Sequence, residues 1–503
     1  MPAKIDSNVT GGRFAEEATL GVLPGSPVWH PLEPNGYKDF GGQISTTARR
    51  PISVTRSRKK GSVTDLDSSG GFMQDLTFNN STRLMQGFMF AAMRERKNTV
   101  PMNGAAIVVT AATAVTNKYT AAAGLNTFLV GSLVLATGFA IAANNGVKTV
   151  TTAIATELTV SEALSAEGAS SGKIETVGFK FPLATLAIAM SGSLVRLTSS
   201  TTDLTTLGFI PGEWIFVGGD AVGSKFVNNQ GWARISAIVA TYLEFDKVDW
   251  APVAELATGL TIQIFTGSVI RNESTEALIT RRSVQLERTL GNDGNGTMSE
   301  YIVGAVANEM TLNVPTAEKV SIDFGFVAIN NEQRTGTTGV KAGTRPAIVD
   351  TVAFNTASDF NRIKLSLVDA TTANVLPLFG YATDMTLTVN NNVSPNKAIG
   401  VLGAFETTTG MFEVGGKVTA YFSDINAVKA VRDNADVTLD MVMVVQNRAL
   451  LFDIPLLALG DGRLNVEQDK AIMVPLETMA AESKYGHTLL FQSFSYVPNA
   501  ALL

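Results

Sequence analysis

The sequence has no cysteine, only two histidines and few charged residues, and each shortage excludes a class of function. Without cysteine, the 503-residue chain has no disulfide, no thiolate metal site and no cysteine nucleophile. His30 and His487 alone cannot supply a multi-histidine metal centre or a histidine-rich acid/base network. Charged residues make up 17% of the chain and hydrophobic residues 45%, so we do not expect long disordered regions.

The charge balance and the hydropathy exclude two further classes. A net charge of −6 argues against a general nucleic-acid-binding protein, which usually presents a basic surface. Met1–Leu20 is polar and lacks the apolar segment of a signal peptide. Residues 128–143 are largely apolar, but this stretch is shorter than the ~20 residues of a membrane span. We therefore expect no signal peptide and no membrane insertion.

Most of the chain has the pattern of short β-strands. Runs of Val, Ile, Thr, Leu and Phe are separated by Gly, Asn and Asp turns, for example at residues 310–314 and 385–389. Two segments favour helices instead: Thr82–Arg96, and Ile425–Asn434 with Asp424 as a suitable N-cap. The sequence thus predicts a mainly β protein.

Two segments in the middle of the chain, residues 131–160 and 212–245, repeat one pattern. Each has two strands, a turn rich in Asn and Gly, and two more strands, and the turn residues favour type I′ hairpins. We interpret them as two small β-barrels or sandwiches, at roughly 103–182 and 190–270. The matched residues are Gly131 with Gly212, Asn144–Gly146 with Asn228–Gly231, and Leu158 with Leu243.

A second duplication relates the two ends of the chain. Residues 75–79 precede the first predicted helix, and residues 419–424 precede the second in the same way. The tripeptide Leu-Asn-Val occurs at residues 312–314 and again at 464–466, and an alternating strand follows each copy. Two large domains of the same organisation are therefore expected.

This duplication also locates an insertion. In the second half a short turn at residues 435–436 joins the helix to the next strand. In the first half roughly residues 98–272 fill the same junction. We therefore predict that both small β units are inserted into one loop of the first large domain, because insertions are tolerated where the loop ends lie close together.

Motifs that would carry catalysis or bind a cofactor are missing. There is no phosphate-binding loop, dinucleotide fingerprint or nucleophile elbow, and Ser57–Lys60 matches S-x-x-K by letters alone. Asn292–Gly296 lacks the spaced carboxylates of a Ca²⁺ loop, so we expect a hairpin turn. No carboxylate pair can be nominated for a glycosidase. We expect no enzyme, cofactor or metal site, and structural roles for His30, His487, Trp214 and Trp232.

The strongest local charge feature is a basic cluster on a long loop or hairpin ahead of the strand at residues 72–78. It is open whether this is a solvated loop, a surface that docks on an acidic face of another copy, or a phosphate-binding site. It lacks the interleaved aromatic residues of a single-strand-binding surface. The cluster consists of Arg49, Arg50, Arg56, Arg58, Lys59 and Lys60.

Both ends of the chain resemble the major tail tube proteins of long-tailed bacteriophages. The resemblance covers roughly residues 1–100 and 275–503 but not the insert. Its motifs are loose, yet they occur in the right order. They are Glu17–Pro24, Ser299–Ala305 leading into Met310–Val314, and Asn390–Val393 followed by Gly410–Val418.

The resemblance implies a β-sandwich of two sheets with a flanking helix. Sheets of neighbouring subunits would continue into a ring around a channel, and rings would stack through a long hairpin into a tube that guides DNA. Most members form hexameric rings with one tube domain per chain, so two domains per chain imply a ring of three copies. The implied partners are further copies of the chain, a tape measure protein, a tail terminator, distal tail proteins and transiently passing double-stranded DNA.

The expected fold class is mainly β, with two tandem tail-tube β-sandwich domains, each with a flanking helix, and two small inserted β-barrel or sandwich domains. Tube domain A is placed at 1–100 and 273–345, the inserted domains at 101–188 and 189–272, and tube domain B at 346–503. The location implied is the virion tail, assembled in the host bacterial cytoplasm. Because each neutralised phosphate adds affinity for DNA, we expect the basic cluster between rings, as a stacking hairpin, rather than in the lumen.

The insert favours a flexible, non-contractile tail, since a sheath would need the space that the insert occupies. We expect the insert to stand off the tube wall, either binding cell-surface glycans or having no ligand. Deleting about residues 101–271 should then leave a competent tube. The alternatives are a β-rich surface, decoration or adhesin protein that forms discrete oligomers, and the tube of a contractile machine.

Overall fold

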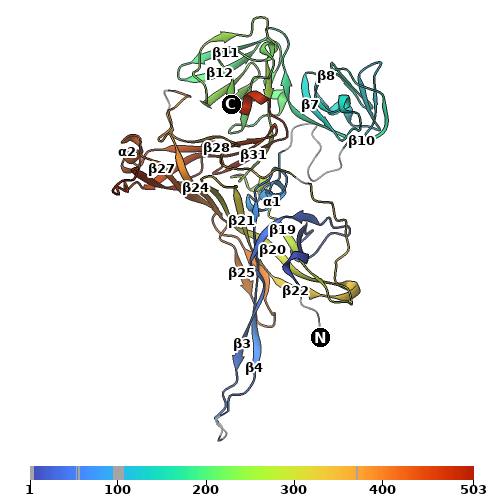
Figure 1. Cartoon of the computed structure of the whole chain (residues 1–503), viewed down its shortest axis with the longest axis vertical. Helices are drawn as coiled ribbons and strands as arrows, with labels where there is room; N and C mark the ends of the chain where they lie inside the picture. Colours follow the sequence, from blue (N-terminus) through green and yellow to red (C-terminus); the bar gives the residue numbers. More distant parts are fainter. Residues whose placement is uncertain are drawn as a thin grey trace.

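The computed structural model describes residues 5–52, 54, 57–94, 107–349, 351–369 and 372–502. Strands dominate these residues, which confirms the mainly β fold class. Figure 1 shows a two-stranded arm that extends from one end of a sheet-rich body, with two compact β units at the other end. None of the described helices is long and apolar enough to cross a membrane.

Two parts of the body share one strand connectivity, and we name them repeat A (residues 10–94 and 283–334) and repeat B (residues 360–494). Repeat A consists of β1 Thr10–Glu16, β2 His30–Leu32, β3 Pro34–Ala48, β4 Gly61–Asp75, α1 Thr82–Phe88, β19 Ser283–Asn292, β20 Thr297–Pro315, β21 Ser321–Ala328 and β22 Asn330–Arg334. Repeat B consists of β23 Phe360–Leu367, β24 Ala382–Asn390, β25 Ser394–Lys397, β26 Ala404–Thr408, β27 Glu413–Tyr421, α2 Asn426–Arg432, β28 Val437–Val445, β29 Arg448–Asp461, β30 Met473–Ala480 and β31 Leu490–Phe494.

The strand pairings of the two repeats correspond, apart from β2 in repeat A and the β25–β26 hairpin in repeat B. Repeat A has an inner sheet β3-β4-β21-β20, and repeat B has β24-β27-β30-β29 in the same order. The far part of β20 also pairs with β19 and β22, as β29 pairs with β28 and β31. Because β20 pairs with β24 as well, the two inner sheets form one continuous eight-stranded sheet.

The two Leu-Asn-Val tripeptides lie at the same point of this pattern. Asn313 pairs with Ser321 of β21, and Asn465 forms a bridge with Met473 at the start of β30. In repeat B the ladder is interrupted, because β29 ends at Asp461 and Gly462 has a φ of +73°. The tripeptide of repeat B is also more exposed, since β24 lies beside β20 and no described strand pairs with this end of β29.

Both helices are shorter than the sequence predicts. The helix predicted at 82–96 ends at Phe88, where Phe90 adopts a φ of +45° and the side chain of Gln86 accepts the Met93 N–H; residues 95–96 lie outside the described range. The second helix spans Asn426–Arg432. The Asp424 carboxylate accepts the Asn426 N–H at 2.7 Å, although the N-cap position itself is Ile425.

One apolar core runs through both repeats. Strand β21 alternates buried and partly exposed residues, so Ile322, Phe324 and Phe326 point into this core. Helix α1 covers them, with the Phe88 ring 5.1 Å from that of Phe324. The opposite face of the inner sheet carries the polar residues of each strand, as period-2 alternation requires.

The insert forms two β units that share one strand. Strand β10 pairs with β5 and β7 of the first unit and with β17 of the second. The boundary expected at residues 188/189 would cut β11, so we place it in the turn at 181–185. Insert 1 contains β5 Val109–Thr113, β6 Lys118–Ala121, β7 Ser132–Thr137, β8 Gly146–Ile154, β9 Glu157–Val160 and β10 Glu167–Lys180. Insert 2 contains β11 Leu186–Ser191, β12 Leu194–Ser199, β13 Trp214–Val217, β14 Gly231–Val239, β15 Tyr242–Val248, β16 Glu255–Leu256 and β17 Gln263–Phe265.

The predicted type I′ turns in the inserts are wrong. Asn145 has a φ of −94°, whereas a type I′ turn needs positive φ at both central residues. Instead, a longer loop is pinned by a buried asparagine in each unit. Asn144 donates to Glu167 at 2.8 Å, and Asn229 donates to Glu255 at 2.6 Å. Side-chain hydrogen bonds therefore replace the tight turn in both copies.

The two ends of the insert lie side by side. Arg94 and Val269 pair through backbone hydrogen bonds of 2.7 and 3.0 Å. The returning strand β18 (Ser268–Arg271) then pairs with β31 of repeat B. The chain thus leaves repeat A and returns along repeat B before it re-enters repeat A at β19.

Candidate assembly surfaces

The hairpin β3–β4 forms the arm (residues 34–75). Near the body, β4 pairs with β21 as far as Ser68. The β25–β26 hairpin of repeat B supports the next part, where Lys397 bonds Asp65 at 2.5 Å and also contacts Asp67. The Lys397 hydrogen bond lowers the pKa of Asp65. Beyond these contacts the arm extends with its two strands paired only to each other (Figure 1).

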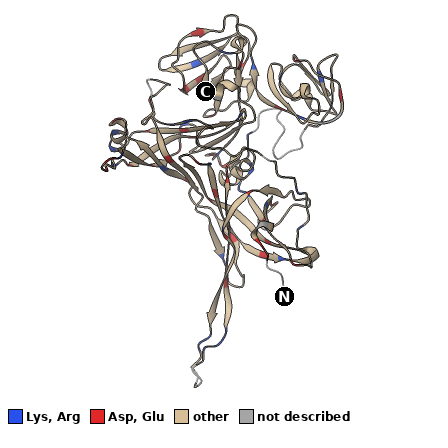
Figure 2. Cartoon of the chain, in the orientation of Figure 1, with Lys and Arg blue, Asp and Glu red and all other residues tan. Residues whose placement is uncertain are grey.

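The predicted basic cluster lies at the end of this arm. Arg56 lies outside the described residues, and the other five members are exposed. No acidic residue occurs in the sequence from 49 to 60. Ile52 and Val54 between the cations are almost fully exposed, at 107% and 99%. Figure 2 shows the basic residues at the end of both arm strands. The described members are Arg49, Arg50, Arg58, Lys59 and Lys60.

The non-core face of the eight-stranded sheet is polar and mainly acidic. Strand registers place Lys38, Gly71, Gly325, Glu309 and Asn390 in one row across the sheet. Small residues and threonines fill much of the rest. The carboxylates on this face include Glu309, Asp323, Asp384, Glu413 and Glu477, against the cations Lys38 and Lys417.

Insert 2 packs on β28, β29 and β31 of repeat B. Trp232 meets Phe494 edge-on with ring centroids 5.0 Å apart. The backbone of Trp214 exchanges two 2.9 Å hydrogen bonds with the side-chain amide of Gln492. Both tryptophans are buried, which confirms their expected packing role. Val442, Val444 and Leu451 complete the apolar contact.

A network of buried or nearly buried charges lies in the same contact. Arg234 of insert 2 lies 3.0 Å from Asp246 and 3.3 Å from Asp453 of β29. Lys247 pairs with Asp440 of β28, which also bonds Arg362 of β23. The network comprises Arg234, Lys247, Arg362 and Lys364 with Asp246, Asp249, Asp440 and Asp453.

Burial and pairing compete in this network. Burial lowers the pKa of Lys247 to about 8, against the attraction of Asp440. Burial raises the pKa of Asp249 to about 6. Burial also opposes ionisation of Asp246, but Arg234 outweighs it and holds the pKa of Asp246 at about 2. Insert 2 is therefore anchored on repeat B, and the expectation that the insert stands off the wall is wrong for this unit.

Asp249 makes the stability of this contact pH-dependent. Its pKa of about 6 in the folded chain exceeds its ordinary value of 3.8, so the folded chain binds more protons between these values and its stability should fall as pH rises from about 4 to about 6. We expect Asp249→Asn to remove this part of the slope in urea unfolding measured across that range. Asp39→Asn, at an exposed site, is the control. An unchanged slope in Asp249→Asn would contradict the assignment.

Both histidines have structural surroundings, as expected. Burial and the nearby Arg271 lower the pKa of His487 to about 3, and its Nδ1 lies 3.3 Å from Arg271 Nη1. Burial and Arg83 lower the pKa of His30 to about 4. Each ring is therefore neutral near pH 7.

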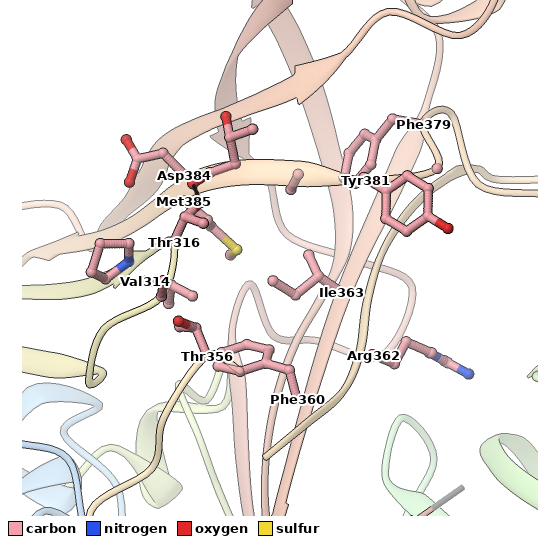
Figure 3. A pocket seen from close by; sticks show the side chains of 15 residues that line it. Val314, Thr316, Thr356, Phe360, Arg362, Ile363, Phe379, Tyr381, Asp384 and Met385 are labelled. Atoms are coloured by element: carbon pink, nitrogen blue, oxygen red, sulfur yellow. Dashed lines mark hydrogen bonds between the residues drawn. The ribbon is translucent and has the colours of Figure 1, made fainter. Parts of the chain in front are cut away.

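A cavity of about 370 Å³ lies where β20 meets β24. In Figure 3 Val314, Phe360, Ile363 and Met385 surround it, while Arg362 points away from it. Its lining combines apolar side chains with polar groups, among them Thr356 and Asp384. The described side chains around this cavity do not bring an acid and a base together as a catalytic site would. The cavity lies at the junction of the two repeats.

Sequence reasoning missed the charge network. The signal was available, because Asp440 and Asp453 each interrupt a strongly apolar strand, and a charge in such a run requires a buried partner. The partners in insert 2, Arg234 and Lys247, lie about 200 residues away along the chain, so the sequence could not supply the pairing.

The described surfaces thus include a projecting cationic arm and the polar non-core face of the eight-stranded sheet. At β3 and at the end of β29 this sheet has edges with no partner strand among the described residues, and such edges are typical of a protein that pairs with copies of itself. No match was found among curated proteins. The family model described as "Phage tail tube protein" matches residues 7–480. The chain therefore belongs to the phage tail tube protein family.

Proposed function

We propose that three copies of the chain close into a ring of pseudo-sixfold symmetry and that such rings stack into a hollow tail tube through which DNA passes. The pairing of β20 with β24 carries this proposal, because it joins two inner sheets of the same connectivity within one chain. Among the described residues, β3 and the end of β29 have no further partner strand and form the free edges of this sheet. Strand β3 of repeat A is the counterpart of β24, and β29 of repeat B is the counterpart of β20, so the free edges correspond to the two strands that pair within the chain. The same pairing between β29 of one chain and β3 of the next closes both edges.

Burial supports the same junction. Leu312 and Val314 are 0% and 5% exposed beside β24. Their counterparts Leu464 and Val466 are 37% and 68% exposed at the free end of repeat B. A β3 strand from the next copy would cover them as β24 covers the first pair. Three chains supply six repeats, which matches a ring of six tube domains.

The polar face of the inner sheet suits a channel for DNA. Carboxylates such as Glu309, Asp323 and Glu477 repel phosphates, whereas each Lys or Arg contact would add affinity and slow the passage. In a ring with this face inward, insert 2 on the outer strands of repeat B lies outside the tube. A contractile sheath would need the same surface, so we propose a non-contractile tail.

The proposal also includes the domain bounds, the partners that the family implies and the location. Tube domain A would comprise residues 1–100 and 273–345, and tube domain B residues 346–503. The inserted domains would lie at 101–185 and 186–272, and the arm would connect successive rings. Partners would be a tape measure protein in the lumen and terminator and distal proteins at the tube ends. The protein would reside in the virion after assembly in the host bacterial cytoplasm.

Disulfide trapping tests the ring, and the chain has no cysteine of its own to interfere. Asn313 faces Thr386 in the β20·β24 junction, and the residues at the corresponding positions are Asn465 and Lys38. Paired strand residues have Cα atoms about 4.5–5.5 Å apart, within disulfide reach. Oxidised tubes of Asn465→Cys/Lys38→Cys should therefore give covalent dimers and trimers on a non-reducing gel, ending at the trimer.

The control pair is Asn465→Cys/Gln43→Cys, because Gln43 lies about 16 Å farther along β3. It should give no ladder. A ladder that reaches six chains would contradict the threefold ring. Electron microscopy of the same samples distinguishes the functions, since particles that never stack would favour a decoration or adhesin protein.

A further inference from the structure

The strand registers define an end of the inner sheet opposite the arm. Asp75 pairs with Ser321 at this end of repeat A, and Tyr421 pairs with Met473 at this end of repeat B. The β25–β26 hairpin of repeat B lies at the other end of the sheet, on the same side as the arm. This end of the sheet opposite the arm has one part in each repeat. We call the part in repeat A the A-end and the part in repeat B the B-end. They have the same connectivity, so they differ through their side chains.

The A-end is polar and its groups are paired. Asn35 donates to Asp75 at 2.7 Å, and Lys319 forms an ion pair with Asp75 at 2.6 Å. Asn80 donates to Glu33 at 3.3 Å and to the backbone carbonyl of Asp75 at 2.8 Å. Val320, the apolar residue beside this network, is fully buried. These polar groups of the A-end are therefore already bonded within the chain.

The B-end exposes aromatic and apolar side chains at the same places. Tyr381 is 78% exposed, and its carbonyl accepts the N–H of Tyr421, which is 44% exposed. The carbonyl of Ile472, the counterpart of buried Val320, accepts the N–H of Phe422, which follows Tyr421, and Ile472 is 37% exposed. Ile425, four residues after Tyr421, is 47% exposed. Exposed aromatic and apolar side chains gathered at one end of a sheet are typical of an interaction surface.

The B-end matches the arm tip in two respects. All charged residues of the tip are basic, and Ile52 and Val54 between them are exposed. The faces of tyrosine rings bind guanidinium groups. The B-end also carries two exposed carboxylates: Asp384 follows Tyr381 by three residues and pairs with Thr419, and Asp424 follows Tyr421 by three residues. The arm and the B-end also lie at opposite ends of the inner sheet, as stacking in a single direction requires.

We infer that the arm tip of one copy docks on the B-end of a copy in the next ring, with Tyr381, Tyr421, Ile425 and Ile472 as the contact surface. The inference rests on the proposed stacked rings. A ring of three chains has three arms but six sheet ends, so the arms select the three B-ends and leave the three A-ends free. The selection fixes a threefold register between rings.

A charge exchange tests this pairing in the full-length chain. Arg49→Glu/Arg50→Glu/Arg58→Glu should reduce the protein that pellets as tubes at least tenfold, because the tip then repels Asp384 and Asp424. Adding Asp384→Arg/Asp424→Arg should restore most of the tubes. The matched control adds Glu33→Arg and Glu318→Arg at the A-end and should restore none; Glu318 is an exposed residue of the β20–β21 turn, next to Lys319.

A second variant tests the apolar part. Tyr381→Ser/Tyr421→Ser changes exposed side chains, so circular dichroism should remain as in the unchanged chain while tube formation falls at least tenfold. The inference would be overturned if the amount of tubes stayed unchanged in the arm-tip variant or in the tyrosine variant. It would also be overturned if the Glu33/Glu318 change restored tubes to the arm-tip variant. The Asn465/Lys38 disulfide trap reports ring closure separately. If the unchanged chain forms no tubes at all, the proposed function fails rather than the choice of end.

Discussion

Replacing residues 95–268 by an Asn-Gly turn is expected to abolish soluble protein and, with it, tube formation. Arg94 and Val269 are adjacent backbone partners, so a two-residue turn can join them without strain at the splice. The expected failure lies elsewhere. The deletion removes insert 2 and uncovers the face of repeat B that it covers, including Val442, Leu451 and Phe494.

The same deletion removes the partners of buried charges. Asp440 would lose Lys247, and Asp453 would lose Arg234. An apolar patch of this size on a soluble chain leads to aggregation. Soluble yield, size-exclusion chromatography and electron microscopy measure the outcome. Abundant tubes of reduced width would contradict this prediction and restore the expectation from the sequence that the insert is dispensable.

A companion variant tests the reason for the failure. The deletion combined with Val442→Thr, Val444→Thr and Phe494→Thr makes the uncovered face polar. It should recover soluble protein in part, because the apolar patch is gone while the unpaired aspartates can then face water. If aggregation persists unchanged, the exposed patch is not its cause.

Arg234→Met is expected to destabilise the folded chain by about 3–5 kcal/mol. The guanidinium is buried between Asp246 and Asp453, and burial of an uncompensated carboxylate costs more than a surface ion pair contributes. Arg234 also holds the pKa of Asp246 at about 2, although burial opposes this. The variant should therefore raise that pKa as well. Urea unfolding followed by tryptophan fluorescence measures the loss.

The control for this variant is Arg196→Met in the same insert. Arg196 pairs with Glu244 at 2.8 Å at a partly exposed site, so we expect a loss of about 1 kcal/mol or less. The double change Arg234→Met/Asp453→Leu should recover part of the loss, because it removes the carboxylate that Arg234→Met leaves unpaired. Equal losses for Arg234→Met and Arg196→Met would show that the buried network does not hold insert 2.

The sequence could predict features that depend on neighbouring residues. Alternation of apolar and polar residues identified β21 and β24, because each strand buries one face. Self-similarity located the Leu-Asn-Val tripeptides, and they lie at the same point of the strand pattern in both repeats. The helix at 82–96 was predicted too long because spacing alone does not reveal the positive φ of Phe90 that ends it.

By itself, the sequence determined the β-rich class, the two duplications, the family resemblance and the cationic character of residues 49–60. These are properties of composition, period and order along the chain. Only the tertiary structure decided that insert 2 is anchored on repeat B, which strand edges stay free, and that the B-end is apolar while the A-end is polar. Each of these depends on contacts between residues hundreds of positions apart, such as Arg234 with Asp453. Such contacts form only when the sheets pack, so no local pattern can specify them.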